Sequence, residues 1–176
     1  MHPGIVIALE LAFLLAMLVA ALRDLAAWSL PNWLSLGVAF GYIPWAWATG
    51  ASWSAIGMGA AAGALVLGIG FILYSVNAWG AGDAKLAAAV AIWIGLSMEL
   101  FRFFLVMSLA GGVLAVIALC LHAVTGNPQL PPGDPGAEIA RRNPLKAKAR
   151  YGAAIAIGAL DYWLRHSQSV CWIVDC

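Results

Sequence analysis

Hydrophobic residues along the chain fall into six runs that are separated by polar breaks. The runs cover residues 4 to 22, 33 to 49, 54 to 76, 84 to 97, 103 to 122 and 151 to about 164. A straight transmembrane helix requires about 20 apolar residues, so the fourth and sixth runs need flanking residues or a locally thinned bilayer. The pattern predicts an all-α fold, a polytopic membrane helix bundle of about six transmembrane helices.

The longest polar stretch, residues 123 to about 150, contains five prolines and ends in a group of basic residues. Prolines interrupt helices, so we predict a flexible cytoplasmic loop here, and a C-terminal tail at residues 166 to 176. The first run lacks a basic amino-terminal region, which favours a retained helix over a cleaved signal peptide. No composition shift marks a second domain, and residues 1 to 176 are expected to form a single integral-membrane domain.

The basic residues predict the orientation of the bundle. If the break after the first run lies in the cytoplasm, seven Lys and Arg residues lie inside and two outside, as the positive-inside rule requires. Both termini then face the outside. The inner group is Arg23, Lys85, Arg141, Arg142, Lys146, Lys148 and Arg150, and the outer group is Arg102 and Arg165.

Composition supports a membrane protein and excludes other classes. Hydrophobic residues make up 64% of the chain and charged residues 10%, with a mean hydropathy of +0.92. A soluble domain could not bury that much apolar surface, so membrane lipid is an expected partner. The net charge is only +1, and no basic stretch is interleaved with aromatic residues, which argues against nucleic-acid binding.

Cysteine and histidine give no metal-ligand spacing, and we expect neither a metal nor a cofactor. Cys120 is expected to be a small buried apolar residue. Cys171 and Cys176 could form a disulfide if the tail faces an oxidising compartment. We also expect the nine tryptophans to anchor the bundle at the membrane interface. Gly59-x-x-x-Gly63 predicts a close approach of two helices.

Two aspartates, Asp24 and Asp83, stand at the ends of apolar runs, where each carboxylate is costly without a purpose. On the predicted topology both lie at the cytoplasmic border. Peptide hydrolysis by carboxylates needs one ionised group to activate water and one protonated group to polarise the carbonyl. Two aspartates that share a proton can supply both. The pair therefore points to an aspartic hydrolase of membrane-anchored peptides.

The neighbours of each aspartate predict its local structure. Gly80 and Gly82 are expected to allow a sharp turn before Asp83 and the close approach of a substrate backbone. Residues 84 to 95 look helical, so Asp83 would stand at a helix N-terminus, where the dipole favours its ionised form. Pro31 can open the next helix, which places Asp24 near a break between helices.

Other charged residues have competing interpretations. Glu10 is 14 residues from Asp24, roughly 21 Å along a helix, so it cannot join Asp24 in one dyad. It either pairs with a polar group in the bundle or contacts substrate, and the first is favoured. Lys85 could bind substrate, bias the charge of Asp83 or act as a snorkelling anchor.

At the predicted outer side, Asp161 and Arg165 have the spacing of an ion pair along one helix. Glu99 and Arg102 are expected to occupy a short outer loop.

The motifs around the two aspartates resemble those of a known family. Asp24 followed at the seventh position by Pro31-Asn32, and then Gly80-Ala81-Gly82-Asp83-Ala84-Lys85-Leu86, resemble the type IV prepilin peptidases. These are the leader peptidases of the Gly-x-Gly-Asp aspartic class. Tyr151-Gly152 is similar to a Pro-Tyr-Gly element of such proteins, with Arg150 in place of the proline. Size and segment count suggest the short, single-domain branch associated with Flp-type (tight-adherence) pili.

The resemblance implies a multi-pass endopeptidase of the bacterial inner membrane with its active site facing the cytoplasm. It would remove the short basic leader of a prepilin, cutting after a glycine just before the apolar pilin helix. Longer relatives also N-methylate the product through an extra amino-terminal portion with a cysteine cluster, so peptidase activity alone is expected here. Asp24 and Asp83 match the catalytic positions, and the supporting motif is Pro31, Asn32, Gly80, Gly82 and Lys85.

Two other functions remain open from the residues alone. A proton-coupled membrane transporter could use Glu10, Asp24 and Asp83 as proton carriers, although no repeat relates the two halves of the chain. An inactive assembly factor could retain the fold, although the presence of both aspartates argues against it.

Overall fold

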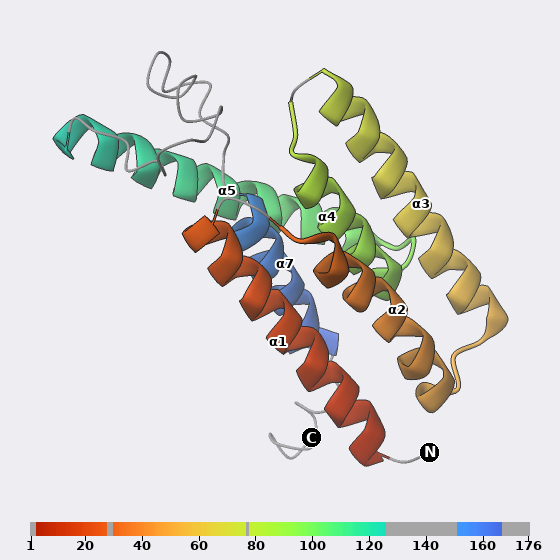
Figure 1. Ribbon diagram of the computed structural model, residues 1–176. Helices are drawn as coiled ribbons and strands as arrows, with labels where there is room; N and C mark the ends of the chain where they lie inside the picture. The colour runs from red at the N-terminus through yellow and green to blue at the C-terminus, as the bar shows by residue number, and fades with distance from the viewer. Residues whose placement is uncertain (1–2, 28–29, 77, 126–150, 167–176) are drawn as a thin grey trace.

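A computed structural model describes residues 3–27, 30–76, 78–125 and 151–166, and within these residues all regular structure is helical. The predicted all-α class is therefore confirmed, and each hydrophobic run corresponds to one helix (Figure 1). In chain order the helices are α1 (Pro3–Ala27), α2 (Asn32–Thr49), α3 (Trp53–Ser75), α4 (Ala81–Ile94), α5 (Met98–Thr125) and α7 (Tyr151–His166).

Three helices are long and apolar enough to cross a membrane by themselves. Their spanning segments are Gly4–Asp24 in α1, Trp53–Ser75 in α3 and Met98–Ile117 in α5. The chain is a membrane protein on this ground. Helices α4 and α7 have 14 and 16 residues. At a rise of 1.5 Å per residue they are roughly 21 and 24 Å long, less than the hydrocarbon core of a bilayer.

The short helix α4 lies at the centre of the bundle and packs against α2, α3 and α7. Its buried side chains surround the helix axis instead of forming one stripe, and Leu86 and Val90 are fully buried. Alanines fill much of the remaining surface, which lets neighbouring helices approach closely. Protein side chains, and not lipid, therefore surround most of this helix.

Glycines on α3 allow its close packing on α4. A Cβ atom added to Gly59 would lie 2.6 Å from the carbonyl oxygen of Ile92, and one added to Gly63 would lie 2.5 Å from the Ile92 Cγ1. Neither position has room for a larger residue. The predicted close approach at Gly59-x-x-x-Gly63 is confirmed.

The prediction that the tryptophans serve as interface anchors is wrong for part of the set. The Trp93 ring lies between helices, with its centroid 4.7 Å from that of Phe13 and 5.5 Å from that of Trp45. Its Nε1 donates to the Val38 carbonyl at 2.9 Å. Aromatic packing and this hydrogen bond hold the ring inside the bundle. Trp53, at the start of α3, is by contrast 89% exposed.

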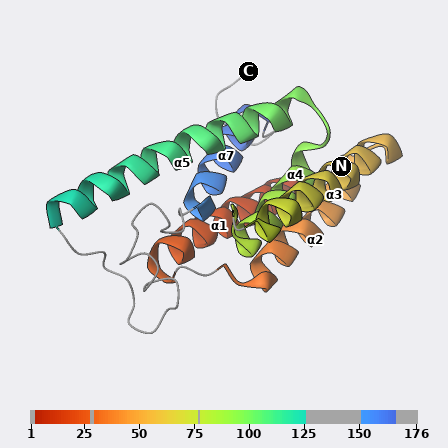
Figure 2. The ribbon, with the colours of Figure 1, turned by 90° about the horizontal axis from the view of Figure 1, so that it is seen from above.

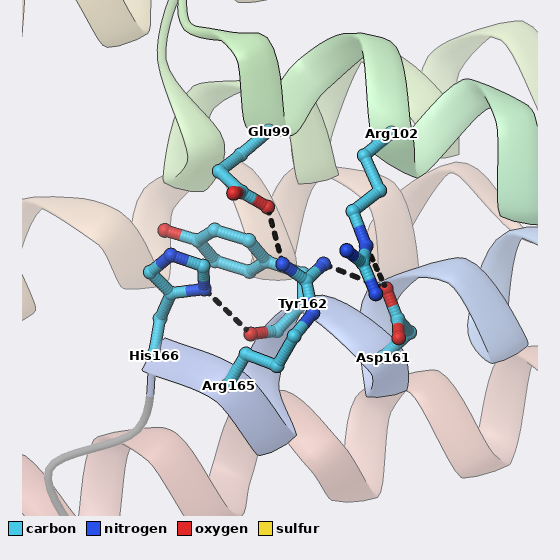
Figure 3. Close-up of polar contacts among 6 residues, drawn as sticks. All are labelled: Glu99, Arg102, Asp161, Tyr162, Arg165 and His166. Carbon is cyan, nitrogen blue, oxygen red and sulfur yellow. Dashed lines mark hydrogen bonds and ion pairs between the residues drawn. The ribbon is translucent and has the colours of Figure 1, made fainter.

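Ion pairs join α5 to α7 near the end of α7 (Figure 3). The Arg165 guanidinium donates to Glu99 Oε2 at 2.6 Å and to Asp161 Oδ2 at 2.7 Å, and Arg102 lies 3.5 Å from the same Asp161 oxygen. The predicted Asp161 and Arg165 pair is confirmed. The predicted outer loop is wrong for Glu99 and Arg102, because α5 begins at Met98 and both residues lie in its first turns.

Two further predictions near the end of α5 need correction. The helix extends to Thr125, so the polar loop does not begin at residue 123. Cys120 is exposed on α5 instead of buried, because this part of the helix extends away from the other helices (Figure 2). The predicted tail begins one residue too early, because His166 is the last residue of α7. The rest of the predicted loop and residues 167–176, with Cys171 and Cys176, lie outside the described residues.

Candidate active site

Asp24 lies in the last turn of α1 and is 7% exposed. Its carboxylate contacts the first turn of α7, where the Ala153 backbone N–H donates to Asp24 Oδ2 at 3.2 Å. First-turn N–H groups have no acceptor within their own helix, and the helix dipole is positive there, so this contact stabilises a carboxylate. The fold thus places the N-terminus of α7, which is distant in sequence, beside Asp24.

Gly152 allows this contact because it has no side chain. A Cβ atom at this position would lie 2.8 Å from the Asp24 Cβ, 2.9 Å from its Cγ and 3.1 Å from its Oδ2. Any larger residue would displace the carboxylate. Gly152 therefore fixes how closely α7 approaches Asp24.

Asp83 lies in the first turn of α4 and is partly buried. The preceding Gly80 is the N-cap, in an extended conformation with φ −79° and ψ 139°. A Cβ atom at Gly80 would lie 2.6 Å from Asp83 Oδ2, so the carboxylate is folded back over the Gly80 backbone. The predicted position of Asp83 at a helix N-terminus is confirmed.

The glycines before Asp83 allow close packing because they have no side chain. They do not adopt positive φ angles. Among the described glycines only Gly50 and Gly95 have positive φ. A Cβ atom at Gly82 would lie 3.1 Å from the Leu30 Cβ, so Gly82 gives room to the connection between α1 and α2. The chain does bend before Asp83, at Ala78 and Trp79, and the two glycines contribute close packing to this turn and not a positive φ.

Contacts between these segments bring the predicted motif residues to one end of the bundle (Figure 1). Leu30 packs on Gly82, and the next residue, Pro31, is the N-cap of α2. The Lys85 Nζ donates to Asn32 Oδ1 at 2.9 Å, which joins the first turns of α4 and α2. This contact gives Lys85 a structural partner that the sequence did not indicate.

An aromatic pair connects the Asp24 side of this end to the Asp83 side. The Trp79 and Tyr151 rings meet edge to face, with centroids 6.5 Å apart and an interplanar angle of 80°. Trp79 directly precedes Gly80, and Tyr151 directly precedes Gly152. The two carboxylates are thus positioned by segments that contact one another.

The Trp79 Nε1 is buried and has no hydrogen-bond acceptor within the described part of the chain. Sequence reasoning grouped this tryptophan with the interface anchors and missed its position beside the candidate site. Its place immediately before Gly-x-Gly-Asp was the only available signal. Glu10 is buried within α1, 4% exposed, and its predicted pairing inside the bundle stays a prediction.

The fold and these contacts define a membrane helix bundle with a candidate carboxylate site at one end. The model of the type IV leader peptidase family matches residues 11–116, from α1 into α5, and this match includes both aspartates. The match covers more than half of the chain, so the protein belongs to the type IV leader peptidase family and is a protease. This finding favours a protease over the proton-coupled transporter. Searches of curated proteins and of solved structures found no match.

Proposed function

We propose that the protein is an aspartic endopeptidase whose dyad is Asp24 and Asp83, and that it removes the short basic leader of Flp-type prepilins. The observation that carries this proposal is the contact among three helix ends that carry or adjoin the two aspartates, those of α1, α4 and α7. The last turn of α1 contacts the first turn of α7 through Asp24, and the segment before α4 contacts α7 through Trp79 and Tyr151. N-methylation of the product is not part of the proposed activity.

Two opposing effects decide how many protons the proposed dyad carries: the helix N-termini favour ionised carboxylates, and repulsion between the carboxylates favours a shared proton. Each aspartate lies against a helix N-terminus, which stabilises negative charge. Two adjacent ionised carboxylates repel each other strongly where the dielectric constant is low. The dyad therefore carries one proton between its members in the active state, and its titration belongs to the pair.

The reaction then follows from this proton count. The ionised carboxylate accepts a proton from a water molecule, whose oxygen attacks the scissile carbonyl carbon. The protonated carboxyl donates its proton to the carbonyl oxygen, giving a neutral tetrahedral intermediate. Breakdown of the intermediate breaks the C–N bond: the carboxyl that took the proton from water donates it to the departing amine, and the other carboxylate accepts a proton from a hydroxyl of the intermediate. A carboxylic acid and an amine leave, and the dyad again holds one proton. No other reactant is required.

We further propose that this end of the bundle faces the cytoplasm at the bacterial inner membrane. Arg23 adjoins Asp24, Lys85 follows Asp83 by two residues, and the basic segment 141–150 directly precedes α7. Arg23 and Lys85 thus lie at the helix ends that carry the two aspartates, the basic segment adjoins α7 in sequence, and basic residues favour the cytoplasmic side. A prepilin leader that begins in the cytoplasm would meet the dyad there.

Asparagine substitution tests the dyad. Asp24→Asn and Asp83→Asn should each lower leader removal by about 10²–10⁴-fold or more, because neither residue can supply both acid and base. The assay is co-expression with an Flp-type prepilin, with leader removal measured as a shift in its size.

Asp161→Asn is the matched control, since Asp161 is an aspartate of the ion-pair cluster on α5 and α7 and should leave cleavage near the wild-type rate. All three variants should accumulate in the membrane. Substantial cleavage by an Asp24 or Asp83 variant would remove that residue from the dyad.

A further inference from the structure

An apolar groove of about 770 Å³ lies between α3 and α5. One wall is formed by residues one helical turn apart on α3, Leu65 and Ile69, and the other by Phe101 and Phe104 on α5. Leu65, Ile69 and Phe101 are 51%, 47% and 68% exposed. The groove is therefore open along its side, and its walls are mainly hydrocarbon.

The groove exists because its two walls belong to helices with different packing partners. Helix α3 packs chiefly against α4, and α5 packs chiefly against α7. Figure 1 shows that α5 runs at a large angle to α3. The central helix α4 is thus covered by α3 and contacts α5 only slightly.

The residues at the two ends of the groove define its length. Trp79, just before α4, lines one end, and Leu96, just after α4, lines the other. Between these ends the lining residues run from Leu65 to Leu73 on α3 and from Leu100 to Ser108 on α5, roughly 12 Å along each helix. That length accommodates about two turns of another helix.

One end of the groove adjoins the candidate active site. Tyr151 and Trp79 both line the groove, and they contact each other at the junction that positions the two carboxylates. A helix in the groove would place its end beside Asp24 and Asp83. The groove is continuous with the proposed site of cleavage.

The chemistry of this end favours a peptide over a lipid chain as the occupant. The buried Trp79 Nε1–H has no acceptor among the residues that the structure describes. Burying an unpaired donor is unfavourable, and a hydrocarbon chain offers no acceptor. The extended peptide that leads into a helix offers backbone carbonyl oxygens that are not used within that helix.

We propose that the groove between α3 and α5 binds the apolar helix that follows the leader of the substrate. The inference rests on the proposed function and adds the docking surface and the direction of binding. The start of the substrate helix lies at the Trp79 end, so the peptide bond before it reaches the dyad. A backbone carbonyl of the substrate residues just before that helix accepts the Trp79 N–H.

Photo-crosslinking at two positions of α3 tests the occupant. Ile69 lines the groove and Leu67 does not, although both side chains are 47% exposed. A photoreactive residue at position 69, in the full chain in phospholipid vesicles with prepilin, should form an adduct with the prepilin. The same residue at position 67 should form adducts with phospholipid only. Exclusive labelling of phospholipid at position 69 would overturn the proposal.

Filling the groove gives a kinetic test on two substrates. Ile69→Trp should lower kcat/KM for full-length prepilin about tenfold or more, because the docked helix can no longer position the scissile bond. Cleavage of a short peptide, the leader plus a few residues, should be unchanged. Leu67→Trp, the matched control, should leave both substrates unaffected.

The possible outcomes distinguish a failure of the groove proposal from a failure of the proposed peptidase function. Wild-type cleavage of full-length prepilin by Ile69→Trp would overturn the groove proposal and leave the proposed peptidase intact. Failure of the wild-type protein to cut either substrate would instead refute the proposed function. The short peptide also reports whether each variant is folded.

Trp79→Phe tests the proposed hydrogen bond. It keeps an aromatic ring against Tyr151 and removes the N–H. We expect kcat/KM to fall for both substrates, with a thermal unfolding midpoint equal to or above that of the wild type, because an unpaired buried donor has been removed. Unchanged kcat/KM would exclude the N–H from substrate binding.

Discussion

At the scale of single residues, the glycines near the two aspartates act through their small size. Added Cβ atoms at Gly80, Gly82 and Gly152 would each meet a neighbouring atom at 3.1 Å or less. At Gly80 and Gly152 that neighbour belongs to an aspartate of the proposed dyad. Each glycine therefore brings a carboxylate or a chain segment closer to the backbone than any other residue would allow.

Gly152→Ala should lower kcat by about 10²-fold, because the added methyl group lies 2.9 Å from the Asp24 Cγ and must displace the carboxylate. The measurement is the single-turnover rate of prepilin cleavage in detergent, beside a thermal melt that reports folding. Gly112→Ala is the control, since no atom lies within 4 Å of its added Cβ. A wild-type kcat in folded Gly152→Ala would show that cleavage does not require the Asp24 position seen in the structure.

At the scale of helices, α3 and α4 form the closest interface of the bundle. Gly59 and Gly63 on α3 face Ile92 and the α4 backbone without room for a methyl group. A membrane provides little hydrophobic driving force between helices, so this close backbone contact supplies the packing energy. Stability should therefore depend on the glycines that face α4, and not on those that face outward.

Gly59→Ala should destabilise the protein by about 1–3 kcal/mol, because its methyl group would overlap the backbone oxygen of Ile92 and force the helices apart. Gly57→Ala, two residues earlier on α3, has open space and should be neutral or stabilising by up to about 1 kcal/mol. Thermal unfolding in one detergent would measure both. Equal stability of the two variants would contradict the packing seen here.

At the scale of the whole molecule, two separate places hold groups with different roles: the two aspartates, and the ion pairs between α5 and α7. The segments around Asp24 and Asp83 lie at one end, and α5 and α7 are joined by Arg165, Glu99 and Asp161 near the end of α7. Because α7 begins beside Asp24 and carries Arg165 in its last turn, it connects the two places. A membrane crossing by α7 would put them on opposite sides of the bilayer.

Reporter fusions test this arrangement. A reporter within residues 126 to 145 should report a cytoplasmic position, and one at the C-terminus should report an external position. Fusions after Arg23 and after Trp53 should be cytoplasmic and external respectively. A cytoplasmic C-terminus would overturn the six-span topology, because α7 could not then cross the bilayer in the predicted direction.

Helix positions were largely predictable because local sequence determines them. Pro31 and Gly95 lie beside the ends of helices, and the hydrophobic runs between such breaks became α1 to α5. The position of Asp83 in a first turn followed from the same signals. The prediction failed for Glu99, because the start of α5 lies within a polar segment that hydrophobicity alone does not assign to a helix.

Burial within the membrane was less predictable, since apolar side chains suit both lipid and protein. Trp93 lies inside the bundle and Cys120 is exposed, the reverse of both expectations. Only the packing of neighbouring helices distinguishes the two environments. For the same reason, the groove beside Ile69 has no sequence signature.

By itself, the sequence determined the helical class, the membrane character and the aspartates at helix ends, because hydrophobic runs and helix breakers act over short distances. Tertiary structure alone decided what surrounds those aspartates. The hydrogen bond from the Ala153 N–H to Asp24 joins residues 129 positions apart. Such a contact depends on how α1 and α7 pack, and helix packing is a property of the whole bundle and not of either segment.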